Sequence, residues 1–99
     1  MYKDIEELID EYAFADAILL DEFSATTKDD GLSDCHEVTL WGLTNKNGNV
    51  IDYAIDHYWT GLQPGCFGVR EVTIIPDLSY WNCEKRFYYK IATEFRGVK

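Results

Sequence analysis

The sequence lacks any apolar run that could cross a membrane. Its notable aliphatic stretch, Ala17–Leu20, is far shorter than the roughly 20 residues that a spanning helix needs. The segment Met1–Tyr12 is acidic and periodic, without the basic start and apolar core of a secretory signal. The three cysteines are an odd number, so they cannot all pair internally, as they would in a disulfide-stapled domain. We therefore expect a cytoplasmic protein that does not bind membranes.

The sequence also lacks a recognisable metal or catalytic motif. No two of Cys35, Cys66 and Cys83 have the C-x-x-C spacing, and the adjacent Cys35 and His36 rarely both reach one tetrahedral ion. A nucleophilic pair of His57 with Cys66 or Cys83 has no local signature. We therefore expect no metal, no cofactor and no catalytic residues. A small Cys/His enzyme or metal-binding protein is the alternative from a different class.

Positive charge is scarce in the first third of the chain. Residues 1–37 hold twelve acids against Lys3 and Lys28, a net charge of −10, whereas residues 38–99 carry +1 and the whole chain −9. Such a field repels nucleic-acid phosphates and anionic lipid, and it attracts basic protein surfaces. The charge therefore predicts a basic protein partner and no direct contact with nucleic acid. An acidic coat that serves only solubility is the simpler alternative.

The first segment has the spacing of an amphipathic helix. Its apolar residues recur on one face at 3.6-residue intervals, and they are Ile5, Leu8, Ile9, Tyr12, Leu19 and Phe23. This spacing predicts a helix over residues 3–12. Beyond it, Asp16 falls on the apolar face, while Phe14 and Ile18 fall on the acidic one. Residues 13–23 are therefore open between helix and strand.

An Asn47-Gly48 pair between two alternating segments, Glu37–Thr44 and Val50–Trp59, predicts a central β-hairpin. A type I′ turn there gives both turn residues a positive φ and pairs Leu40 with Ile55 and Trp41 with Ala54. The face predicted to form the core carries Val38, Leu40, Ile51, Tyr53 and Ile55. The opposite face carries Thr39, Trp41, Leu43, Asp52 and Asp56.

The rest of the chain completes a small sheet. Residues 24–36 are predicted as a polar loop with a turn at Asp29–Gly31, and residues 60–65 as a second loop. Val69–Ile75 is predicted as a strand that Pro76 ends. Residues 84–96 fit a helix or a strand, and their aromatic residues favour a fourth strand. The sequence thus predicts one α+β domain over residues 1–99: an N-terminal amphipathic helix packed on an antiparallel sheet of three to four strands.

An exposed tryptophan ringed by acids is typical of an interaction hot spot. On the predicted hairpin Trp41 has this setting, beside Asp52 and Asp56. The residues expected to contact a partner are Glu7, Asp10, Glu11, Phe14, Asp21, Glu22, Trp41, Leu43, Asp52 and Asp56.

In size and charge the chain is similar to the anti-restriction and anti-CRISPR inhibitors of phage. That similarity implies a non-enzymatic nucleic-acid mimic that occupies the basic surface of a nucleic-acid-processing enzyme. An immunity protein that neutralises a basic toxin would need the same charge and is the first alternative. A homodimer through the exposed hairpin face is also compatible with the pattern.

Overall fold

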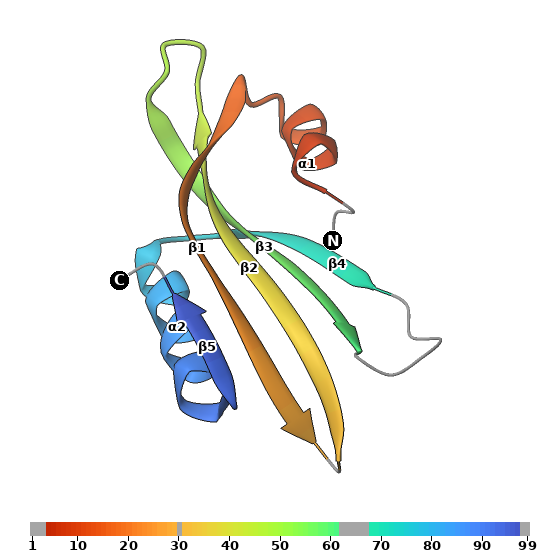
Figure 1. Cartoon of the computed structure of the whole chain (residues 1–99). Helices are drawn as coiled ribbons and strands as arrows, with labels where there is room; N and C mark the ends of the chain where they lie inside the picture. The colour runs from red at the N-terminus through yellow and green to blue at the C-terminus, as the bar shows by residue number, and fades with distance from the viewer. Residues whose placement is uncertain (1–3, 30, 62–67, 98–99) are drawn as a thin grey trace.

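The computed structural model describes residues 4–29, 31–61 and 68–97. The elements are, in chain order, α1 (Ile5–Tyr12), β1 (Asp16–Asp29), β2 (Leu32–Thr44), β3 (Val50–Gly61), β4 (Val69–Ile75), α2 (Leu78–Ile91) and β5 (Glu94–Gly97). The strands form one antiparallel sheet in the order β4-β3-β2-β1-β5 (Figure 1). Neither helix among the described residues is long and apolar enough to cross a membrane.

The two helices lie on opposite faces of the sheet (Figure 1). On the face called the α2 face, Trp81 and Tyr88 of α2 pack against Phe23, Val38 and Leu40. On the face called the α1 face, Leu8 of α1 is buried with the strand residues Leu43, Ala54 and Val72. Both clusters consist of alternate residues of the same strands, because successive side chains of a strand point to opposite faces. The sheet therefore has a separate apolar core on each side.

The coarse prediction of an α+β fold with an N-terminal helix packed on an antiparallel sheet is confirmed, but several details are wrong. The sheet has five strands rather than three to four. The helix packs on the hairpin face predicted to be exposed, so that Leu43 is a core residue. On the face predicted as the core, Ile51 is 53% exposed.

The predicted loop over residues 24–36 is wrong, since these residues extend β1 and begin β2. Phe23 and Ala25 are buried on the α2 face, whereas Ser24 and Thr26 alternate with them on the other face. A strand with one uncovered face can carry polar residues there, and this makes it look like a loop in sequence. The predicted turn at Asp29–Gly31 falls between the two strands; Gly31 has φ +82°, and Asp30 lies outside the described residues.

Of the two structures left open for residues 84–96, the favoured fourth strand is wrong and the helix forms. Most of it belongs to α2, and only Glu94–Gly97 forms a strand. The helix begins after Asp77, whose carboxylate accepts a hydrogen bond from the Ser79 N–H at 2.8 Å. Trp81 and Tyr88, two turns apart, face the sheet, and the aromatic alternation that favoured a strand comes from Phe87 and Tyr89, which are exposed. Val69–Ile75 is a strand as predicted.

The predicted pairings of Leu40 with Ile55 and of Trp41 with Ala54 are present between β2 and β3. The turn itself is not type I′. Gly48 has φ +84°, but among the described residues Ala13 is the sole non-glycine residue with a positive φ. The Asn45 side chain accepts hydrogen bonds from the N–H groups of Asn47 and Asn49, at 3.0 and 3.1 Å. The Gly48 N–H donates to the Asn45 carbonyl at 2.9 Å, so the turn closes with Gly48 as its one left-handed residue. The loop predicted at residues 60–65 lies outside the described residues from 62 on.

Candidate functional site

Helix α1 presents its carboxylates to solvent. The Asp4 carboxylate accepts a hydrogen bond from the Glu7 N–H at 2.8 Å and so begins the helix, which ends at Ala13 in a left-handed conformation. Leu8 is fully buried against the sheet. The helix acids are exposed, and they are Glu6, Glu7, Asp10 and Glu11. Because α1 has no basic residue, its outer surface carries only negative charge.

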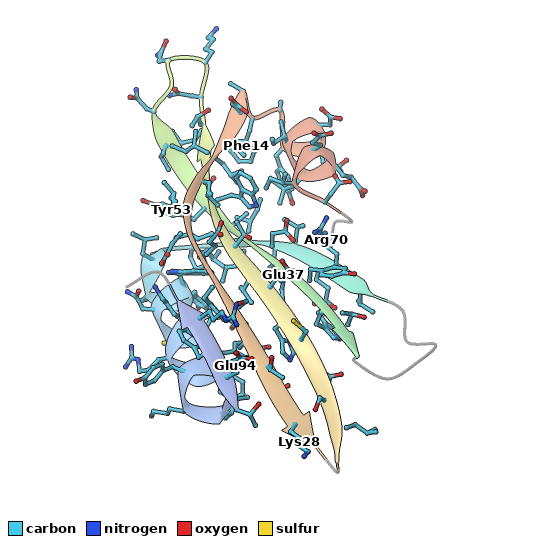
Figure 2. The ribbon with its side chains drawn as sticks, in the orientation of Figure 1. Phe14, Lys28, Glu37, Tyr53, Arg70 and Glu94 are labelled. Carbon is cyan, nitrogen blue, oxygen red and sulfur yellow. The ribbon has the colours of Figure 1, made fainter. Side chains whose placement is uncertain are left out.

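The apolar members of the predicted site lie beneath this helix. Leu43 is fully buried and cannot contact a partner without unfolding, so its predicted role as an exposed anchor is wrong. Trp41 is half-buried in the same cluster, and Phe14 packs there at the end of α1 (Figure 2). The Trp41 Nε1 atom is buried and, among the described residues, makes no hydrogen bond of normal geometry. Phe14 and Trp41 thus pack between α1 and the sheet, and because neither is fully buried, their contact with a partner stays a prediction.

Two acids of the predicted site are neutralised within the chain. Asp21 lies on the α2 face, where its carboxylate accepts hydrogen bonds from Lys85 Nζ at 2.8 Å and Trp81 Nε1 at 2.9 Å. Partial burial opposes ionisation, but these hydrogen bonds prevail and lower the pKa of Asp21. Asp56 lies 3.3 Å from Arg70 on the α1 face, and burial raises the pKa of this carboxyl. Both carboxylates therefore serve internal ion pairs.

The exposed carboxylates of α1 lie on the same side of the sheet as two exposed strand acids, Glu22 and Glu37. Glu22 and Glu37 are exposed on adjacent strands of the α1 face, below the part that α1 covers. They line a shallow depression of about 400 Å³ together with Ser24, Thr39 and Arg96. Asp52 is half-buried on the same face. We call the exposed carboxylates on this side the acidic surface; its members are Glu6, Glu7, Asp10, Glu11, Glu22 and Glu37.

The structure also shows an apolar segment that the sequence analysis did not assign to a site. Ile18, Leu19 and Leu20 of β1 are 42%, 53% and 42% exposed. One sequence feature pointed to this segment. If the N-terminal helix had continued, Ile18 would have lain on its acidic, solvent-exposed face, where an aliphatic side chain is unusual. This signal fits a strand edge.

A histidine pair lies on the α2 face beside Tyr88. His36 Nδ1 and His57 Nε2 are hydrogen-bonded at 3.0 Å, and His36 Nε2 is 2.9 Å from Thr27 Oγ1. Burial, and then the neighbouring His36, lower the pKa of His57 to about 4. Burial also lowers the pKa of His36, and it raises the pKa of Tyr88 to about 12. The sequence analysis treated His57 as a packed histidine but did not find its partner.

A small pocket of about 230 Å³ adjoins this pair and is lined by His57, Glu71 and Glu84 among others. Burial raises the pKa of Glu84. Among the described residues no group of three or more His, Cys, Asp or Glu side chains could hold a metal ion. Cys35 lies on the α1 face, away from both histidines, and Cys83 is exposed on α2. Cys66, a ligand or nucleophile in the alternative prediction, lies outside the described residues.

Comparison with known proteins gives no relative: no protein-family model, no curated protein and no solved structure matches the chain.

Proposed function

We propose that the protein is a non-enzymatic, acidic binding module that docks on a basic surface of another protein. The observation that carries this proposal is the acidic surface on the α1 side of the sheet. Ion pairs among the described residues join Arg70 to Asp56, Lys85 to Asp21 and Arg96 to Glu94, and none of them includes a member of the acidic surface. Carboxylates without counter-ions raise the local concentration of a cationic partner.

The charge is unevenly placed: the bases Arg70 and Arg96 lie on the α1 face in ion pairs with Asp56 and Glu94, and Arg96 also borders Glu22 and Glu37. The outer side of α2 carries the exposed bases Arg86 and Lys90, whereas α1 on the other face of the sheet is wholly acidic. A polarised molecule is oriented as it approaches a charged partner, which speeds association more than it tightens the complex. The same field repels phosphates. A partner whose own ligand is a nucleic acid fits best, because its basic groove already matches a row of carboxylates.

The sharper form of the proposal is inhibition of a nucleic-acid-processing enzyme, in the manner of anti-restriction or anti-CRISPR proteins. Neutralisation of a basic toxin is the alternative, since it draws on the same acidic surface. Competition separates the two: double-stranded DNA displaces the module from an enzyme whose nucleic-acid groove it fills, but not from a toxin bound at another site.

The experiment measures association of the protein with a partner captured from its host. Neutralising α1 with Asp10→Asn and Glu11→Gln should slow association several-fold and flatten its dependence on salt. The matched control adds the same charge to α2 through Asn82→Lys and Tyr89→Lys, both at exposed positions, and should have little effect. Equal effects of the two pairs, or an association rate that does not change with salt, would show that the acidic surface serves only solubility.

A further inference from the structure

One edge of the sheet is unpaired over half of a long strand. β1 has 14 residues, but β5 has only four and pairs with Phe23–Thr26. Among the described residues, the preceding segment Asp16–Glu22 pairs with β2 alone (Figure 1). Among the described residues no strand pairs with the outer side of this segment, where the N–H groups of Ala17 and Glu22 instead donate hydrogen bonds to the Asp16 and Asp21 carboxylates at 2.8 Å. A further strand can pair there where it displaces these side-chain acceptors.

The central side chains of this free edge are apolar. Ile18 lies opposite Gly42 on the α2 face, and an added Cβ on Gly42 would be 3.0 Å from Leu20 and 3.1 Å from Val50. Leu20 and Val50 thus lie on the same face, beyond the part that α2 covers. Leu19, opposite Trp41, points to the other face. A strand added at this edge would find aliphatic contacts on both faces of the sheet.

Natural edge strands are usually protected from such pairing by lysine, proline or a β-bulge. Asp16–Glu22 contains neither lysine nor proline, and its single irregularity is a register shift between Leu19 and Asp21. The shift leaves Asp16–Leu19 in regular pairing with β2. Four residues are also the length over which β1 already pairs with β5. The free edge is therefore long enough for a strand contact.

Charge decides what occupies the edge. The exposed acids Asp16 and Glu22 flank the aliphatic centre, and no base lies in the segment, whereas Asp21 is paired with Lys85 of α2. Antiparallel pairing of the whole segment with a second copy, centred on Leu19, would set Asp16 opposite Glu22 at both ends, and like charges directly opposite each other are destabilising. A strand with basic and apolar residues would meet opposite charges there instead.

We propose that the free edge of β1 binds an extended, basic and apolar segment of the partner protein by β-strand addition. This inference rests on the proposed function and supplies its binding mode: the acidic surface attracts the partner, and the β1 edge holds one of its strands. Main-chain hydrogen bonds supply affinity in this mode, and side chains that alternate between the two faces supply selectivity.

The probe is a short, capped peptide in which lysine and valine alternate, carrying a fluorophore for anisotropy. The matched control peptide has the same sequence with N-methyl groups along one edge, which keep its charge but remove main-chain donors. Binding of the first peptide, at least about tenfold weaker binding of the second, and slower amide exchange within Asp16–Glu22 are expected. Absence of binding, equal affinity for both peptides, or unchanged exchange in this segment would overturn the inference.

Variants locate the contact. Ile18→Lys places a like charge on the edge and should weaken binding of the lysine-valine peptide about tenfold. Ile51→Lys is the matched control, because Ile51 is also an exposed aliphatic residue but belongs to β3, away from the free edge. Equal affinities of the two folded variants overturn the inference. If a variant does not fold, the peptide comparison and the amide exchange still test strand addition, because both use the unaltered protein.

The outcomes also separate this inference from the proposed function. If the peptide binds at α1 and does not slow amide exchange at the β1 edge, the proposed acidic binding module stands, but strand addition is overturned. A concentration-dependent dimer in sedimentation, abolished by Ile18→Lys but not by Ile51→Lys, would show that a second copy covers the edge, and it would overturn the proposal of a basic segment.

Discussion

Acidification should destabilise the fold through the histidine pair. His36 Nδ1 and His57 Nε2 lie 3.0 Å apart, so protonation of both rings would place two N–H donors against each other. Burial and the neighbouring His36 lower the pKa of His57 from 6.5 to about 4. In the unfolded chain the ring titrates near the ordinary value of about 6.5. Between these two values the unfolded state binds a proton that the folded state excludes.

The size and sign of the effect follow from that difference. One pKa unit corresponds to about 1.4 kcal/mol, so the interval from 6.5 to about 4 corresponds to a maximum of roughly 3 kcal/mol. Because the unfolded state binds more protons, stability rises with pH over this window. The contribution of His57 to the free energy of unfolding is fully present above about pH 6.5 and is lost as the pH falls toward 4. The steepest slope is about 1.4 kcal/mol per pH unit for one proton.

Urea unfolding followed by tryptophan fluorescence between about pH 7.5 and pH 4.5 measures this slope. The control is His57→Phe, which keeps an aromatic ring but cannot bind the proton. Other titratable groups face or adjoin the pair from β2, β4 and α2, and they are Asp34, His36, Glu71, Glu84 and Tyr88. Most of what these groups contribute to the pH dependence of stability cancels when the variant is subtracted from the unaltered protein, because both proteins carry them.

The reasoning predicts that the unaltered protein loses more stability than the variant between about pH 6.5 and pH 5. General acid unfolding, driven by protonation of paired carboxylates, should appear in both proteins at lower pH. Equal slopes for the two proteins above pH 5 would refute the assignment of a depressed pKa to His57. A slope of opposite sign would mean that the folded pair binds the proton more tightly than the unfolded chain does.

The other predictions concern stability. Asp21→Asn should cost about 1–2 kcal/mol in urea unfolding, because it weakens the link to α2, whereas Asp10→Asn on the exposed side of α1 should stay within about 0.5 kcal/mol. Gly48→Ala should cost about 1 kcal/mol, since Gly48 has φ +84° with open space around it, so a lowered thermal midpoint would report backbone strain rather than a clash. Leu43→Ala should cost about 2–5 kcal/mol and exposed Leu19→Ala less than about 1 kcal/mol; similar losses would contradict the burial of Leu43 under α1.

The sequence predicted the structure correctly where a local pattern was not opposed by another pattern in the same segment. The pairing of Leu40 with Ile55 followed from two alternating segments around Asn47-Gly48, even though the turn between them is of another type. Val69–Ile75 was predicted correctly because its alternation ends at a proline. In both places local preference and tertiary packing favour the same structure, which is the condition under which sequence patterns are reliable.

Prediction failed where a surface departs from the usual pattern of buried apolar and exposed polar residues. β1 was missed because the half-buried Ser24 and Thr26 lie on the part of the α1 face that no helix covers, and polar residues there resemble a loop. α2 was missed because exposed Phe87 and Tyr89 imitate a strand. A helix start was nonetheless present in Asp77, directly after Pro76. Weighting this cap above aromatic propensity would have identified the helix.

The site was only partly predictable for a related reason. The acids of α1 were found because charge is visible in sequence, and their exposure follows from the helix stripe on the opposite side. Leu43 was misplaced because the sequence shows which residues share a hairpin face but not which face a distant helix covers. The histidine pair depends on the pairing of β2 with β3 and on Tyr88 from a helix that was not predicted. Contacts between distant elements of this kind leave no local pattern.

The arrangement of the two helices explains how an apolar edge can persist in this protein. A short helix covers one end of each face, so each face keeps an uncovered region. On the α1 face that region is polar, with Glu37 exposed and Ser24 half-buried, and it needs no cover. On the α2 face it contains Ile18 and Leu20, which water solvates poorly. Two copies that approach through this edge bring together molecules of net charge −9, and this repulsion opposes self-association without any covering element. The same charge offers no resistance to a basic strand. The acidic composition would thus protect the edge from other copies of the chain while leaving it open to a partner of opposite charge.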